Sequence, residues 1–335
     1  MDFLKYQKYK QKYIDSKDRF GDRVAVIFGG TTGIGLETAI EFVRENISKV
    51  VVCGRSPEKW NYSLGTVRNR LGKLADRIEY KGCDVRIYSQ VDAVMKYVFD
   101  KYGRCDIMFN NAGVQPLAVD GGDITKMDWE SFVGNDGSII FRIPPLNKDS
   151  CLTGRTPTSN FCENPIATTV IGTFNCLKAE LTYVYALQPK NLPVAIINTS
   201  SRNGILPNKE RPLYASSKAF IIALTKSVAS QAAQKSITQQ RTFPIRINCI
   251  APGPILTPLE IPIYLPDVNP FKQLTDEEYK QFNEKGSQGV PLGRTGMPHE
   301  IATVVCFLAD EKTSSYMTGT CIEVDGGYCS SPIFN

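Results

Sequence analysis

The chain has 335 residues, of which 42% are hydrophobic and 22% charged, and its net charge at pH 7 is +5. This length and apolar content suffice for one large α/β core, since such folds often exceed about 200 residues as a single domain. The basic residues are spread along the chain without a nucleic-acid-binding motif, so we expect no nucleic-acid partner. No apolar run is long enough to span a membrane and no secretory signal is visible, so we expect a cytoplasmic protein with reduced thiols.

Residues 1–20 form a basic and aromatic extension before the single domain that we expect over 21–335. Phe3, Tyr6 and Tyr13 recur there at helical spacing with lysines between them. A basic amphipathic helix of this kind can lie on an anionic membrane. Such a stripe more often packs on its own domain or on a second subunit, and we favour that role over membrane contact.

Seven apolar runs predict strands, and helical patterns lie between them. The runs are found at about 24–28, 50–53, 77–81, 106–109, 194–198, 245–250 and 321–324. Strands that alternate with helices predict a Rossmann-type α/β fold, a doubly wound parallel sheet of about seven strands with helices on both faces. Ligands of such sheets bind at the carboxyl ends of the strands.

A glycine-rich turn follows the first of these strands. Gly29, Gly33 and Gly35 stand between the apolar run 24–28 and a helical pattern over 36–43. Glycines let the backbone approach a pyrophosphate, and the start of the next helix offers unpaired N–H groups and a positive dipole end. The segment is therefore predicted to bind the phosphates of a dinucleotide.

The end of the second strand indicates which dinucleotide is bound. Sites that prefer NAD usually carry a carboxylate there, about twenty residues past the glycines. This chain has Arg55 at that place, followed by Ser56, whose hydroxyl could assist. A guanidinium pairs with a 2′-phosphate through two hydrogen bonds, whereas a carboxylate would repel it. We therefore predict NADP(H) in preference to NAD(H).

Three polar residues in the second half of the chain form a candidate catalytic group. Tyr214 and Lys218 lie four residues apart, and Ser201 lies thirteen residues before the tyrosine. Residues i and i+4 share one face of a helix, so we expect the Lys218 ammonium close to the Tyr214 phenol. A fixed cation should lower the tyrosine pKa from about 10 and make it a general acid/base near neutral pH.

Together these motifs resemble the short-chain dehydrogenase/reductase family, over about residues 21 to 328. The resemblance implies hydride transfer between nicotinamide and a carbonyl or alcohol. Tyr214 would then exchange the proton, Ser201 would polarise the carbonyl, and Lys218 would also hold the nicotinamide ribose. It also implies a homodimer or homotetramer.

Further stretches follow in the order of this family. Cys83-Asp84-Val85 comes after the third strand, Asn110-Asn111-Ala112-Gly113 after the fourth, and Ala251-Pro252-Gly253-Pro254-Ile255 at the end of the sixth. The residues that the resemblance places on the cofactor are Gly29, Thr31, Thr32, Gly33, Ile34, Gly35, Arg55, Ser56, Asp84, Val85, Asn111, Ala112, Gly113, Tyr214, Lys218, Pro252, Gly253, Ile255 and Thr257.

The central helix departs from the family pattern. The family usually carries an asparagine three residues before a glycine, where it maintains a water chain for proton relay. The matching residue here is Thr169, three residues before Gly172. A threonine can still hold a water, but the change leaves open a catalytically weak, NADP-binding regulatory or scaffold protein. Asn175 lies beyond Gly172 and is expected to be structural.

Two segments are longer than the family outline. Residues 117–166 contain an Asp-Gly turn signal between apolar runs, which predicts a hairpin and then a loop, with a role in substrate choice, in subunit contact or in neither. Residues 254–290 begin with an apolar, proline-rich stretch that would close over the substrate as a lid. Its apolar character favours a hydrophobic substrate.

Other reaction classes fit the sequence less well. The central helix is also similar to the dienoyl-CoA reductase branch, which leaves enoyl- or dienoyl-thioester reduction as an alternative to keto/alcohol chemistry. A Ser-His-Asp hydrolase would have to use His299, the only histidine, which stands at a predicted helix start without a Gly-x-Ser-x-Gly motif. Cys151 and Cys162 are isolated, and the sequence shows no metal-ligand spacing.

Overall fold

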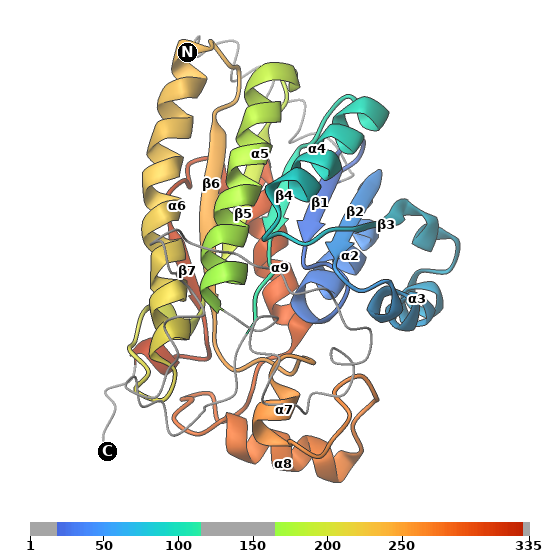
Figure 1. Ribbon diagram of the computed structural model, residues 1–335, viewed down its shortest axis with the longest axis vertical. Helices are drawn as coiled ribbons and strands as arrows, with labels where there is room; N and C mark the ends of the chain where they lie inside the picture. The colour runs from blue at the N-terminus through green and yellow to red at the C-terminus, as the bar shows by residue number, and fades with distance from the viewer. Residues whose placement is uncertain (1–18, 115–164, 331–335) are drawn as a thin grey trace, which may run out of the picture.

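The computed structural model describes residues 19–114 and 165–330. These residues form one sheet of seven parallel strands with helices on both faces, which confirms the predicted fold (Figure 1). The strands are β1 (Val24–Phe28), β2 (Lys49–Gly54), β3 (Ile78–Gly82), β4 (Ile107–Asn110), β5 (Val194–Thr199), β6 (Ile245–Pro252) and β7 (Cys321–Val324). The extension up to residue 18 and the hairpin and loop expected over 117–164 lie outside the described residues.

The first strand is continuously apolar because both faces of the sheet are covered there. In β1, Val24, Val26 and Phe28 pack into one core and Ala25 and Ile27 into the other. Successive side chains of a strand point to opposite faces, so a strand buried on both sides has no polar positions. This burial explains why the sequence located each strand to within two residues.

Helices divide into two layers (Figure 1). One layer consists of α4 (Tyr88–Tyr102), α5 (Gly172–Leu187) and α6 (Pro212–Thr238). The other consists of α2 (Gly33–Arg44), α3 (Pro57–Leu71) and α9 (Pro298–Ala309), with α10 (Glu311–Ser314) after it. Among the helices of the described ranges, none has both the length and the apolar character of a membrane span.

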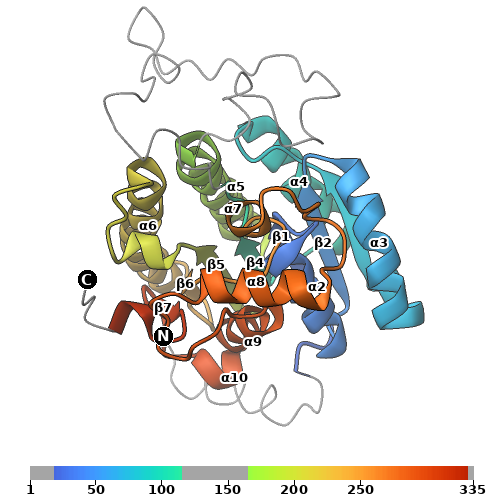
Figure 2. The ribbon, with the colours of Figure 1, turned by 90° about the horizontal axis from the view of Figure 1, so that it is seen from below.

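The order of the strands locates the expected ligand cleft. It is β3-β2-β1-β4-β5-β6-β7, so the chain runs outward in opposite directions from β1 and β4. Loops that leave the carboxyl ends of these two strands diverge to opposite faces and leave a crevice between them. Two short helices, α7 (Ile261–Tyr264) and α8 (Asp276–Gly286), lie across this end of the sheet (Figures 1 and 2).

The segment 254–290 has a small core of its own. Ile261, Leu265 and Phe282 are at most 5% exposed and pack together, and the ring of Tyr264 meets that of Phe282 edge-on at 5.2 Å. These apolar side chains therefore pack against one another within the segment. Their presence in the sequence no longer argues for a hydrophobic substrate.

Candidate active site

The glycine turn after β1 brings two loops into backbone contact. Gly29 has a φ of +81°, and a Cβ there would lie 2.6 Å from the backbone nitrogen of Ala112. A Cβ on Gly35 would overlap the carbonyl oxygen of Gly29. The Asn111 side chain donates to that same carbonyl at 3.0 Å. The turn therefore needs glycine at both positions, and it joins the ends of β1 and β4 at the crevice.

The start of α2 faces this turn. Helix α2 begins at Gly33, and its N-cap residue Thr32 makes no side-chain capping bond, which leaves first-turn N–H groups available. Thr257 packs over the turn, since a Cβ on Gly33 would lie 3.4 Å from the Thr257 side chain. Uncapped N–H groups beside a closely packed glycine turn fit the phosphates of a dinucleotide. Thr31 and Ile34 belong to the same turn.

The end of β6 forms the opposite wall. Pro252 is the last residue of β6, Gly253 donates from its backbone nitrogen to Val324 at 3.0 Å, and Ile255 pairs with Gly296. A Cβ on Gly253 would lie 2.7 Å from the Cα of Asp325. Close packing therefore fixes this loop against the strand that follows it.

The residues expected at the adenosine end lie at the ends of β2 and β3. Arg55 is exposed, while the Ser56 hydroxyl caps α3, accepting from the Lys59 nitrogen at 3.2 Å and donating to Glu58 at 2.8 Å. The hydroxyl of Ser56 is therefore already used to cap the start of α3.

Asp84 forms an ion pair just after β3. Its carboxylate meets the Arg86 guanidinium at 2.6 Å, within a part-buried contact. Burial alone would raise the pKa of Asp84, but the hydrogen bonds and charge of Arg86 lower it below the usual range. Asp84 is therefore an anion at neutral pH. Val85 follows it and accepts from Asn175 at 2.9 Å, which gives Asn175 the structural role that the sequence indicated.

The three predicted catalytic residues lie together. Tyr214 and Lys218 are both buried on α6, and the lysine nitrogen lies 5.7 Å from the centre of the phenol ring. Ser201 ends the loop after β5, and its side chain is hydrogen-bonded to Tyr214. Lys218 also donates to the carbonyl oxygen of Thr199 at 3.0 Å, which holds it at the end of β5.

The expected lowering of the Tyr214 pKa is wrong for this structure. Burial raises the pKa of the phenol well above its usual range, and the nearby Glu260 carboxylate raises it further. The hydrogen bond with Ser201 lowers this pKa by less. Burial also lowers the pKa of Lys218, to about 8. Desolvation therefore decides the direction of the shift, and Tyr214 is a protonated phenol at neutral pH.

Thr169 lies close to Lys218 in an irregular turn. It belongs to a π-helix, η4 (Ile166–Ile171), which leads into α5. A Cβ on Gly113 would lie 3.3 Å from the Lys218 nitrogen and 3.9 Å from the Thr169 hydroxyl, so all three groups meet there. The Thr169 hydroxyl is buried and has no hydrogen-bond partner among the described residues. A buried hydroxyl of this kind is a fitting anchor for a water molecule.

Comparison with known proteins agrees with this geometry. Residues 23–135 match the family model described as short chain dehydrogenase, and residues 156–329 match the one described as Enoyl-(Acyl carrier protein) reductase. The chain is 44% identical, over 94% of its length and 99% of the relative's, to an uncharacterized short-chain type dehydrogenase/reductase of Acanthamoeba polyphaga mimivirus. The chain belongs to the short-chain dehydrogenase/reductase family.

Some other members of the short-chain dehydrogenase/reductase family share less sequence with this chain. The 3-oxoacyl-(acyl-carrier-protein) reductase FabG of Thermotoga maritima is 27% identical, over 92% of this chain and 98% of its own length. Among solved structures, "ElxO with NADP Bound" has a TM-score of 0.67 at 26% identity, covering 92% of this chain and 100% of that one. Levodione reductase has a TM-score of 0.67 at 25% identity, covering 94% and 100%. The chain is therefore an oxidoreductase of this family.

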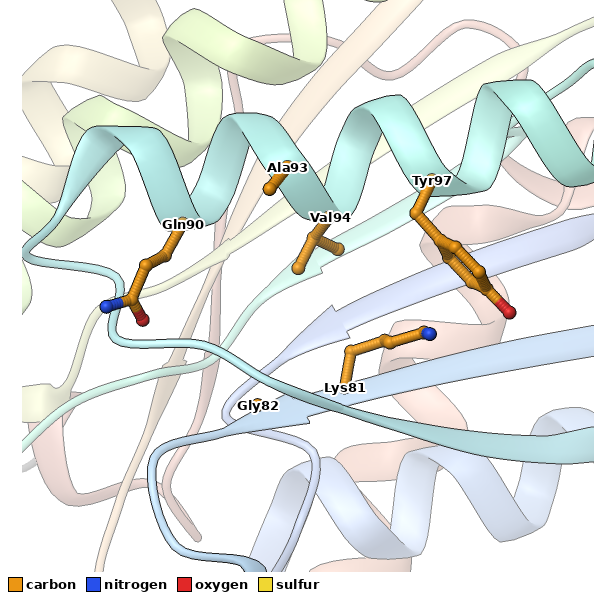
Figure 3. Close-up of a pocket in the computed structure, with 6 residues that line it drawn as sticks. All are labelled: Lys81, Gly82, Gln90, Ala93, Val94 and Tyr97. Carbon is orange, nitrogen blue, oxygen red and sulfur yellow. The ribbon is translucent and has the colours of Figure 1, made fainter.

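Two other features of this family member are not part of the cleft. A hollow at the outer edge of the sheet is lined by β3 and α4, and the Lys81 nitrogen lies 3.5 Å from the centre of the Tyr97 ring within it (Figure 3). This hollow is on the edge strand, whereas Ser201 lies in the loop after β5 and Tyr214 on α6. His299 is exposed near the start of α9, the helix start that the sequence predicts.

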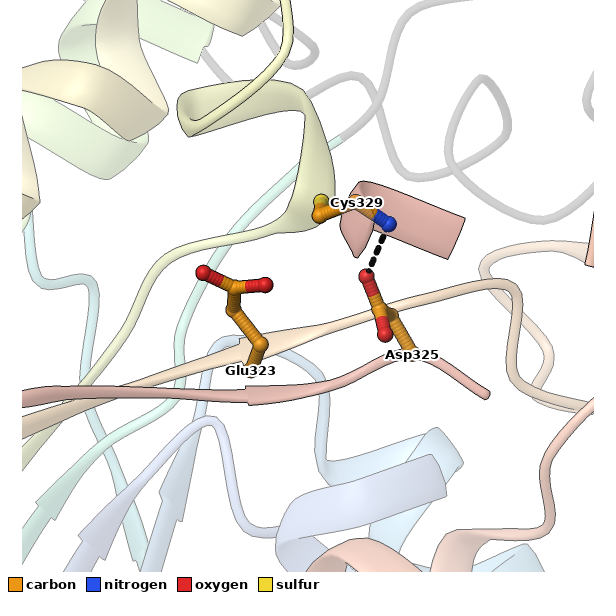
Figure 4. A group of neighbouring side chains, drawn as sticks. All are labelled: Glu323, Asp325 and Cys329. Carbon is orange, nitrogen blue, oxygen red and sulfur yellow. Dashed lines mark hydrogen bonds between the residues drawn. The ribbon is translucent and has the colours of Figure 1, made fainter. Parts of the chain in front are cut away.

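Glu323, Asp325 and Cys329 lie close enough together to suggest a metal site (Figure 4). Both carboxylate oxygens of Asp325 are already used, however. One accepts from the backbone nitrogen of Gly327 at 2.9 Å and the other from that of Cys329 at 2.8 Å. The Asp325 carboxylate therefore serves to cap the turn after β7.

A buried acid beneath the site was missed by the sequence reasoning. Glu180 on α5 is 0% exposed and accepts from Asn110 at 3.1 Å. Asn110 also donates to Asn198 at 2.9 Å, and Asn198 donates to Thr225 at 2.9 Å. Burial raises the pKa of Glu180 to about 8, so the group is mostly protonated at pH 7. An acidic residue on the apolar face of α5 was the sequence feature that could have indicated this buried acid.

We expect Glu180 to make stability depend on pH. Its pKa rises from 4.5 in the unfolded chain to about 8 in the fold, so between these values the folded state holds a proton that the unfolded chain has lost. Stability is therefore highest below the lower pKa and falls as the pH rises through the higher one. We expect the free energy of unfolding to fall by up to about 4 kcal/mol between roughly pH 5 and 8, measured by urea titration.

The substitution Glu180→Gln should abolish this part of the pH dependence, because an amide does not titrate. Glu284→Gln, at an exposed site on α8, serves as the control and should leave the slope unchanged. An equal slope in Glu180→Gln and the wild type would show that Glu180 is ionised in the fold.

Proposed function

We propose that the protein is an NADP(H)-dependent reductase or dehydrogenase of a small carbonyl or alcohol compound. The observation that supports this most is the meeting of Ser201, Tyr214 and Lys218 at the carboxyl end of the sheet, beside the glycine turn after β1. A bound nicotinamide supplies or accepts the hydride in such a site. The polar residues of this chain then have to bind the substrate oxygen and move one proton.

In the reducing direction the proton donor is the Tyr214 phenol. Its pKa is raised by burial, so the proton is present at neutral pH and is available to the forming alkoxide. Ser201, which is hydrogen-bonded to Tyr214, binds the same carbonyl oxygen from the other side. Lys218 would hold the ribose of the cofactor, and with Thr169 it would hold the water that returns a proton to Tyr214.

We propose that the cofactor lies along the crevice from the glycine turn to Tyr214. Its pyrophosphate fits the uncapped start of α2 at Gly33, with Thr257 over it. The adenosine end fits Asp84 and Val85 at the end of β3, and Asn111 to Gly113 line the middle. Arg55 is the residue that we assign to the 2′-phosphate, and the NADP bound by the relative ElxO supports this choice of cofactor.

We expect Arg55→Ala to change the cofactor preference. Loss of a charge-assisted hydrogen bond to phosphate costs about 1.5–3 kcal/mol, so the NADPH dissociation constant should rise about 10- to 100-fold. NADH binding should stay unchanged, because NADH has no 2′-phosphate. Fluorescence titration with both cofactors measures this. Arg68→Ala, at an exposed site on α3, is the matched control. An equal loss for both cofactors would remove Arg55 from the 2′-phosphate site.

A second candidate is the reduction of an acyl thioester. It is favoured by the match of residues 156–329 to the family model described as Enoyl-(Acyl carrier protein) reductase. The intact Tyr214 and Lys218 pair favours the keto/alcohol reaction. Thr169 leaves a third candidate, a regulatory or scaffold protein that binds NADP(H) without catalysing a reaction.

One panel separates these candidates. NADPH and NADH oxidation would be followed with aldehydes, ketones, 3-oxoacyl thioesters and enoyl thioesters, and NADP reduction with alcohols. Turnover of a ketone or an aldehyde supports the first proposal, and turnover of enoyl thioesters alone supports the second. Tight NADPH binding without turnover of any compound would favour the regulatory or scaffold role.

We also propose a homodimer or homotetramer, which an elution mass of one chain would contradict.

A further inference from the structure

Two arginines lie near Tyr214, close enough for their charges to act on its phenol. Arg202 directly follows Ser201 and begins the short helix η5 (Arg202–Gly204). Arg211 is the N-cap residue of α6, three positions before Tyr214. Because Ser201 and Tyr214 are hydrogen-bonded to each other, the two arginines come from the two chain segments that converge on the reacting oxygen.

The Arg202 side chain is held in place by a ring contact, but one of its hydrogen-bond donors has no acceptor among the described residues. Its guanidinium lies 4.0 Å from the centre of the Tyr328 ring, on which it stacks. Its Nη1 atom is buried and has no hydrogen-bond partner among the described residues. A buried guanidinium donor without an acceptor is unfavourable, and an anionic oxygen is its strongest partner.

The acid beside these arginines carries only part of a negative charge. Glu260, the N-cap residue of α7, is the carboxylate whose charge acts on Tyr214. Burial raises the pKa of Glu260 to about 7, while the charges of Arg202 and Arg211 lower it by less. Glu260 is therefore about half ionised at pH 7, beside the two guanidinium groups of Arg202 and Arg211. Two guanidinium charges and at most one carboxylate charge give this group of three side chains a net positive charge, which favours an anionic ligand.

We propose that Arg202 and Arg211 bind an anionic group of the substrate, a carboxylate or a phosphate a few bonds from the reacting carbonyl. This inference rests on the proposed reductase function and names the substrate class of the same site. A guanidinium binds either anion through two hydrogen bonds, which would orient the carbonyl toward Ser201 and Tyr214. The burial of the apolar residues of α7 and α8 in their own core agrees with a polar rather than a hydrophobic substrate.

Paired substrates test this in the wild-type protein. One arm compares short oxo acids with their methyl esters, and the other compares phosphorylated oxo compounds with their unphosphorylated forms, all with NADPH. The anionic member of a pair should have a kcat/KM at least about 10-fold higher. The arm with the higher values identifies the anion. Equal or better turnover of the neutral members would overturn the inference and leave the reductase function standing. No turnover of any member would overturn both.

Variants then locate the contact. Arg202→Met and Arg211→Met should each lower kcat/KM for the anionic substrate by about 10- to 100-fold and leave that for the neutral partner within about two-fold. Arg202→Lys keeps the charge but not the two-pronged geometry, and it should lose less than Arg202→Met. Arg68→Met on α3 is the control. Equal losses for both members of a pair would show that the arginines are merely structural, and the inference would fail.

Discussion

Tyr214→Phe should reduce kcat by about 10²- to 10⁴-fold, the usual contribution of a general acid. The substitution removes only the hydroxyl from a side chain that is 5% exposed, so the packing of α6 is retained. NADPH binding should therefore stay close to that of the wild type. Steady-state kinetics with the best carbonyl of the panel, and fluorescence titration with NADPH, measure the two quantities separately.

Tyr185→Phe is the matched control for Tyr214→Phe. Tyr185 lies on α5 beside Lys235, outside the crevice, and loss of its hydroxyl should leave kcat unchanged. If Tyr214→Phe kept more than about a tenth of the wild-type kcat, the proton would come from another group. A parallel loss of NADPH binding would instead point to a disturbed crevice.

Removing one partner of the buried ion pair between β6 and α10 should cause the largest loss of stability. Arg246 and Glu311 are 2% and 1% exposed, and their side chains meet at 2.9 Å. Arg246 also donates to the Leu308 carbonyl and to the Ser314 hydroxyl, each at 2.9 Å. Glu311→Ala leaves the guanidinium charge buried without its carboxylate. We expect the free energy of unfolding to fall by about 3–5 kcal/mol.

The pair can be tested by a double substitution. Arg246→Met with Glu311→Leu removes both charges together and fills their volume with apolar atoms. Its loss should be smaller than that of Glu311→Ala, because no unpaired charge remains. Urea unfolding of the single and double variants gives the comparison. A loss below about 1 kcal/mol for Glu311→Ala would show that water reaches Arg246.

The sequence was most informative where structure depends on neighbours along the chain. The strand β1 and the glycine turn after it combine local apolar pattern with glycine spacing, and both lie where the pattern placed them. The i, i+4 spacing also placed Lys218 beside Tyr214. Local spacing could not give the direction of the Tyr214 pKa, because burial by distant segments decides it.

The less predictable features join residues that are far apart in sequence. Glu180 meets Asn110 across 70 positions, and its raised pKa comes from complete burial, which no local pattern reports. Likewise, Arg202 and Glu260 become neighbours only when α7 lies across the carboxyl end of the sheet (Figure 2). Such contacts require the fold itself, so the grouping of Arg202 with Glu260 was not visible in the sequence.

Isotope transfer tests the central claim most directly. NADPH carrying deuterium at nicotinamide C4 would be incubated with the protein and a carbonyl substrate, and the product would be analysed by mass spectrometry and NMR. We predict one deuterium on the carbinol carbon of the alcohol, and none when Tyr214→Phe replaces the wild type over the same time. A product without the label, or a bound cofactor that transfers nothing to any carbonyl or thioester, would contradict the assignment of this crevice to hydride transfer.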